Sequence, residues 1–188
     1  MSVRSIVPLI ACSASLACAP AVPKTSDNAA SEGNLLEAFV TSNFTVFNKL
    51  EGLAIESGID LESEASDVWP QVGEAQVPFG SSDVVVDFAV DRDDFSRIGR
   101  IWSVSMILDP LMADGQATEG TLDGTWTYWE EVEGDPSQSW VQMELTGLIN
   151  HSGTAGEADT DLFAIVNADG DIWQANVLLG DDSYVKEP

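Results

Sequence analysis

Hydrophobic residues recur at helical spacing in the first part of the chain. Between Asn34 and Ser57 they fall close to one helix face, at Leu36, Val40, Phe44, Phe47, Leu50 and Ala54. Asn34 and Glu37 have the spacing of a capping box, in which two side chains satisfy backbone N–H groups of the first turn, and Gly58 suits a helix end. The pattern predicts one long helix over residues 34–57, although the β-branched residues of 41–46 would also suit a strand.

From Asp83 onward, apolar and polar residues alternate, which is typical of strands with one buried face. The alternation predicts six strands, at about residues 83–90, 98–108, 124–132, 138–149, 161–167 and 171–179. Residues 59–82 contain two prolines and two glycines and are predicted to connect the helix to the first strand. Because successive strands are joined by turns, the predicted fold class is α+β, an antiparallel meander with the helix across one face. A small closed β-barrel is the alternative.

The dipeptide Asp169-Gly170 lies between two apolar runs and is typical of a two-residue hairpin turn. Such a turn predicts three direct pairs on the core face: Val166 with Trp173, Ala164 with Ala175, and Leu162 with Val177. The partners agree in polarity, which favours this register.

A second predicted hairpin contains several aromatic residues. If residues 133–136 form its loop, the direct pairs are Trp129 with Trp140, Tyr128 with Val141, and Trp126 with Met143. Trp129 and Trp140 then lie on the face opposite the core, where exposed indoles can stack on a carbohydrate or anchor a protein partner. The alternatives are that the helix covers this face, or that the two indoles only join the strands.

Composition adds a strong negative charge to this picture. The 188 residues include 32 Asp and Glu but only 7 Lys and Arg, which gives a net charge of −25. Nucleic acid is not expected as a partner, because phosphate binding requires lysine and arginine. Cations, cationic partners and neutral sugars stay open, and solubility alone also explains the charge.

The N-terminus has the features of an export signal. Arg4 precedes an apolar segment that is shorter than the roughly 20 residues needed to span a bilayer. Ser15-Leu16-Ala17-Cys18 resembles the lipobox of bacterial lipoproteins. The resemblance is limited to this leader, and it implies a signal peptide over residues 1–17, a lipid on Cys18 and attachment to the bacterial outer membrane. Cleavage after Ala21 is the alternative, and it would give a freely secreted protein.

Residues 18–33 are rich in Ala, Pro and Ser and are predicted to be a flexible tether. The two cysteines, Cys12 and Cys18, precede the body of the chain, which therefore has no thiol for catalysis or for binding a metal. Residues 34–188 are predicted to form a single globular domain.

Candidate catalytic and metal-binding residues are few. His151 is the only histidine, and no serine lies in a nucleophile elbow, so an exposed loop histidine is the favoured interpretation. Among so many acids, a glycosidase-type carboxylate pair cannot be singled out. Asp91, Asp93 and Asp94 share one loop and are weak candidates for calcium, which prefers carboxylate oxygens.

These observations favour a non-enzymatic binding domain of the cell envelope, without a cofactor, in which Trp129 and Trp140 are the candidate ligand-binding residues. One alternative is a hydrolase with a carboxylate pair in a deep cleft, where at least one acid has a raised pKa. The other is a structural envelope protein without a small ligand, in which both faces of the Trp-containing strands are buried.

Overall fold

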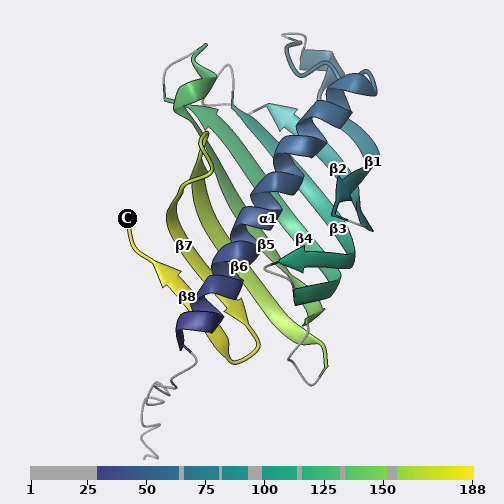
Figure 1. Cartoon of the computed structure of the whole chain (residues 1–188). Coiled ribbons are helices and arrows are strands. Elements are labelled where there is room, and N and C mark those ends of the chain that lie inside the picture. Colours follow the sequence, from purple (N-terminus) through teal and green to yellow (C-terminus); the bar gives the residue numbers. More distant parts are fainter. Residues whose placement is uncertain are drawn as a thin grey trace, which may run out of the picture.

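The computed structural model describes residues 29–63, 66–80, 82–92, 99–113, 116–131, 134–151 and 156–188. The predicted signal peptide, Cys18 and the tether as far as residue 28 lie outside these ranges. The described residues form one long helix and an eight-stranded antiparallel sheet (Figure 1). The predicted α+β class is therefore confirmed.

Helix α1 (Ala29–Glu56) crosses one face of the sheet diagonally (Figure 1). Its buried apolar side chains include most of the predicted face: Val40, Phe44, Phe47, Leu50 and Ala54. Thr41 and Thr45 are helical, and each hydroxyl donates to the carbonyl oxygen four residues earlier, at 3.1 and 2.9 Å. The helix begins within the predicted tether, so the prediction that it starts at Asn34 is wrong.

The end of α1 follows the prediction. Gly58 has a φ of 98°, a conformation that glycine adopts at little cost. Its N–H donates to the carbonyl oxygen of Ile55 at 3.0 Å, and the N–H of Ile59 donates to that of Ala54 at 3.0 Å. This pair of hydrogen bonds is a Schellman motif, and it ends the helix after Glu56.

The strands follow one another in chain order across the sheet. They are β1 (Gln71–Phe79), β2 (Ser82–Arg92), β3 (Arg100–Ala113), β4 (Gln116–Glu130), β5 (Ser139–His151), β6 (Ala158–Asn167), β7 (Ile172–Leu179) and β8 (Asp182–Lys186). The six predicted strands correspond to β2 through β7. Two short 3-10 helices, Ser66–Val68 and Pro136–Gln138, precede β1 and β5.

The two edge strands, β1 and β8, are absent from the prediction, which has six strands. Strand β1 lies in the segment predicted as a connection, and only Val77 of its residues is buried. Pro78 is tolerated there because an edge strand needs hydrogen bonds on one side only. Strands β1 and β8 do not pair with each other, so the sheet is open and the alternative of a closed barrel is wrong.

The sheet curls around α1 (Figure 1). The core consists of buried side chains from the helix and from the sheet. At its centre, the ring of Phe47 meets Trp102 and Trp126 nearly at right angles, with centroid separations of 6.2 and 5.6 Å. Both tryptophans are fully buried and pair directly across β3 and β4. Edge-to-face contacts of this kind stabilise an aromatic core beyond the area that they bury.

Glycines on the core side allow β4 and β5 to approach closely. Gly120, Gly124 and Gly147 each pair with a large aliphatic residue of the facing strand: Ile149, Leu145 and Leu122. A Cβ at Gly147 would lie 2.0 Å from the carbonyl oxygen of Thr121, and one at Gly124 would lie 2.0 Å from that of Glu144. The tight curl of the sheet around α1 therefore depends on these glycines.

Candidate functional site

The face of the sheet that points away from α1 carries the predicted tryptophan pair. Trp129 of β4 pairs directly with Trp140 of β5, as the sequence predicts. The neighbouring pairs are also as predicted, and Trp126 and Tyr128 are buried on the helix side. Trp129 and Trp140 themselves are only half-buried. The structure thus confirms the register and the faces on which these residues lie.

A third tryptophan joins them because β7 contains a bulge. The predicted pairs of Ala164 with Ala175 and of Leu162 with Val177 are present, but the prediction for Trp173 is wrong. Val166 pairs with Ile172 instead, because the register shifts by one residue between Ile165 and Val166. Ile172 takes the core position, and Trp173 is turned outward, where 47% of it is exposed.

The turn before β7 explains the bulge. The predicted two-residue turn at Asp169-Gly170 is replaced by a three-residue loop closed by a hydrogen bond from the N–H of Asn167 to the carbonyl oxygen of Asp171, at 3.1 Å. Gly170 has a φ of 87°, and the side chain of Asn167 accepts hydrogen bonds from the N–H groups of Asp169 and Asp171. The loop is one residue longer than predicted, and the extra residue at Trp173 restores the predicted register beyond it.

The three outward tryptophans line one hollow, which we call the tryptophan hollow: Trp129, Glu131, Trp140, Ile165 and Trp173. Its volume is about 260 Å³, and it opens onto the face of the sheet that points away from α1, here called the helix-free face. The rings of Trp140 and Trp173 lie 6.1 Å apart between centroids, with their planes at 70°. Two of its walls therefore stand nearly perpendicular, and Glu131 is its charged lining residue.

A second, wider hollow lies on the same face and is here called the acidic hollow. It is a shallow hollow of about 490 Å³, and the outward side chains that line it are Asp123, Thr125, Glu144, Thr146, Asp161 and Phe163. Phe163 is two residues from Ile165 along β6, so the two hollows are neighbours on this face. Three carboxylates line the acidic hollow, which makes its potential negative.

The charge of the surrounding chain has one sign. The sequence from Ile101 to Val185, which includes every residue of both hollows, contains no lysine and no arginine. The potential over the helix-free face is therefore negative, and it favours cations over anions.

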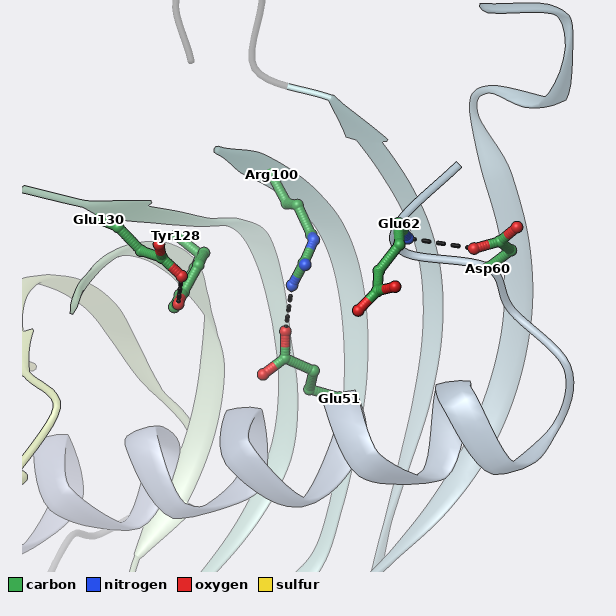
Figure 2. Close-up of polar contacts among 6 residues, drawn as sticks. All are labelled: Glu51, Asp60, Glu62, Arg100, Tyr128 and Glu130. Carbon is green, nitrogen blue, oxygen red and sulfur yellow. Dashed lines mark hydrogen bonds and ion pairs between the residues drawn. The ribbon is translucent and has the colours of Figure 1, made fainter. Parts of the chain in front are cut away.

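A polar cluster of a different kind fastens the second half of α1 to the sheet (Figure 2). The guanidinium of Arg100, on β3, donates to the carboxylate of Glu51, on α1, at 2.6 Å. Burial raises the pKa of Glu51 above its usual range, even though Arg100 acts in the opposite direction. The same guanidinium lies 5.5 Å from the ring centre of Tyr128.

Tyr128 and Glu130 complete this cluster (Figure 2). The hydroxyl of Tyr128 donates to the carboxylate of Glu130 at 2.8 Å, and the other oxygen of Glu130 accepts from the N–H of Gly134 at 2.8 Å. Burial, together with the hydrogen bond to Glu130, raises the pKa of Tyr128 to about 12. Glu51 and Glu130 thus both have protein partners, and neither lines either of the two hollows.

Of the other predicted candidates, the structure describes Asp91 and His151. Asp91 is exposed and accepts from the N–H of Arg92, while Asp93 and Asp94 lie outside the described residues. Among the residues that the structure describes, no three His, Cys, Asp or Glu are grouped so that they could hold a metal ion. His151 is the last residue of β5 and pairs with Thr118, so the prediction that it lies in a loop is wrong.

No protein-family model matches the chain, and comparisons with curated proteins and with solved structures give no match. None of the helices in the described part of the chain is both long enough and apolar enough to cross a membrane.

Proposed function

We propose that the chain is a non-enzymatic binding domain of the bacterial cell envelope that holds its ligand in the tryptophan hollow. The observation that carries this proposal is the convergence of Trp129, Trp140 and Trp173 on one hollow of the helix-free face. Concave sites lined by aromatic side chains and a few polar groups are typical of ligand-binding pockets.

The exposure of these rings supports binding over a purely structural role. A structural protein without a ligand is expected to bury both faces of the strands that contain them. Instead, Trp173 exposes 47% of its surface, and a β-bulge turns it outward. Bulges often aim a side chain at a functional site, and exposed aromatic surface marks interaction sites.

The hydrolase alternative has less support. Its most favourable feature is the raised pKa of Glu51, because perturbed carboxyl groups are common in active sites. However, Arg100 binds the carboxylate of Glu51, and Glu130 binds Tyr128 and Gly134. These contacts account for the cluster as a fastening between α1 and the sheet.

Calorimetric titration of a ligand panel tests the binding function. The panel contains a neutral oligosaccharide, choline as an organic cation, and the neutral tert-butyl analogue of choline. At least one member is expected to bind saturably, and this binding is expected to disappear in a Trp140→Ala, Trp173→Ala double variant. Leu148→Ala is the matched control, since Leu148 is 46% exposed on the same face and lies eight residues along β5 from Trp140, roughly 27 Å away. Heat signals that survive in the double variant, or their absence for every ligand, would contradict the proposal.

Lipid anchoring through Cys18 is the second part of the proposal and has a separate test. The intact mass of the protein from its native host is compared with that of a Cys18→Ala variant. A chain that starts at Cys18 with a diacylglycerol and an acyl group, both lost in the variant, is expected. A chain that starts at Val22 without any addition would instead make the protein freely secreted.

A further inference from the structure

The shape of the tryptophan hollow narrows the class of ligand. A sugar ring stacks on a flat aromatic surface, and its hydroxyl groups need hydrogen-bonding partners. Here the rings of Trp140 and Trp173 are inclined at 70° to each other. Among the residues that the structure describes, Glu131 is the only polar side chain besides the indoles in the lining. Two inclined aromatic walls suit a compact group that contacts both rings, and they serve a flat, hydroxyl-rich one poorly.

The electrostatics of the hollow favour a positive ligand. The face of an indole ring carries negative potential, and tryptophan is the best of the aromatic residues for binding a cation. Glu131 adds a carboxylate at the hollow, and Glu144 and Asp161 belong to the acidic hollow beside it. The stretch of chain that forms both hollows contains no lysine or arginine to oppose this attraction.

The small number of polar groups in the lining further favours a methylated cation. A primary ammonium group has three N–H donors, and removing it from water is costly unless each finds an acceptor. Within the described ranges, Glu131 is the single carboxylate side chain in the lining. A fully methylated ammonium has no N–H donor, and its apolar methyl groups pack directly against Ile165 and the indole rings.

We infer that the tryptophan hollow is an aromatic cage for a quaternary, methylated ammonium cation without an attached anionic group. This inference rests on the binding function proposed above and names its ligand class. The third wall of the cage is Trp173, which the bulge in β7 supplies.

The experiment compares choline with its tert-butyl analogue, in which an uncharged carbon replaces the nitrogen at nearly constant shape. Both are titrated into the full chain by calorimetry at low salt. Choline is expected to bind at least about tenfold more tightly than the analogue, because several cation–π contacts depend on the charge. Equal affinities would overturn the inference and leave the binding function standing, since apolar burial alone would then explain the site.

Two further arms of the experiment separate the inference from the proposed function. If the neutral oligosaccharide binds at the tryptophans and choline does not, the ligand class is wrong and the binding function holds. If no member of the panel binds, both fail together. Phosphocholine is expected to bind more weakly than free choline, because its phosphate meets an acidic face. Tighter binding of phosphocholine would overturn the assignment to a cation without an anionic group.

A conservative variant guards against a simple loss of folding. Trp140→Phe with Trp173→Phe keeps apolar rings in the walls but weakens their attraction for a cation. The affinity for choline is expected to fall about threefold or more, while that for the tert-butyl analogue stays within about twofold. An equal loss for both ligands would overturn the inference.

Discussion

The close approach of β4 and β5 makes a sharp prediction about stability. In a Gly147→Ala variant the new Cβ would lie 2.0 Å from the carbonyl oxygen of Thr121 and 3.1 Å from the Cα of Leu122, both of which are backbone atoms. Ordinary Cβ contacts begin at 3.4 Å, so the two strands must separate by more than an ångström. Neither neighbour is a flexible side chain that could move aside.

The cost follows from two terms. Overpacking of a filled core costs about 1–3 kcal/mol, and a ladder hydrogen bond that lengthens loses about 1 kcal/mol. Alanine recovers about 0.5–1 kcal/mol because it restricts the unfolded chain. We therefore expect Gly147→Ala to lower the free energy of unfolding by about 1–3.5 kcal/mol. For a domain of this length, that corresponds to a fall in Tm of about 2–14 °C.

Gly52→Ala is the matched control, because the same substitution is expected to have the opposite sign. Gly52 lies within α1 and is exposed, and a Cβ at this position would have no atom within 4 Å. Alanine there should raise stability by about 0.5–1 kcal/mol through its higher helix propensity. Urea denaturation measures both, with the midpoint compared at unchanged slope. A free energy of unfolding for Gly147→Ala within about 0.5 kcal/mol of the wild type would contradict the predicted clash between β4 and β5.

Three further predictions concern the core, the polar cluster and the hollow. Asn43 is 1% exposed; its amide nitrogen donates to the carbonyl oxygen of Phe39 at 2.9 Å, but its Oδ1 accepts no hydrogen bond within the described residues. Asn43→Leu removes this buried acceptor at the cost of one local hydrogen bond, and it should raise the free energy of unfolding by up to about 1 kcal/mol in the same urea assay. Because the pKa of Glu51 is raised in the folded state, the unfolded chain loses this proton first as pH rises above 4.5. The contribution of Glu51 to stability therefore falls as pH rises from 4.5 to the raised pKa of the folded state. Glu51→Gln should remove this fall from the pH dependence of the urea midpoint. Glu56→Gln, at an exposed position, should leave it in place. Trp173→Ala should change the free energy of unfolding by less than about 1 kcal/mol, as expected for a half-exposed ring, while it weakens binding in the calorimetric assay.

The regular part of the sheet follows from the sequence because side-chain alternation reports directly which face of a strand is buried. This is why β2 and β5 are predicted close to their observed bounds. The alternation fails in the first half of β4, where the core-facing positions Gly120 and Gly124 have no side chain to report burial. As a result, the predicted strand starts at 124 instead of Gln116. The first half of β4 could have been predicted from the spacing of Gly120 and Gly124, if these glycines are interpreted as a close approach between strands.

The candidate site is only partly predictable, for a different reason. Trp129 and Trp140 are correctly paired because the register that follows from the assumed loop, residues 133–136, is the observed one. The prediction puts Trp173 on the wrong face because the loop has one residue more than predicted and β7 has one bulged residue. The two extra residues compensate each other, so the pairing farther along β6 and β7 is as predicted. The cluster of Glu51, Arg100 and Tyr128 joins residues far apart in the chain, and no local pattern relates them.

The bulge connects the fold to the proposed binding site. Asn167 fixes the loop through two hydrogen bonds to backbone N–H groups, and this loop places the residue that follows Ile172 on the outer face. The other walls of the hollow, Trp129, Trp140 and Ile165, lie on strands whose ladders hold them in place. A site built on strands in this way is largely formed before its ligand arrives. Binding therefore loses little free energy to the ordering of side chains and loops. A small cation that makes few contacts can then still bind measurably.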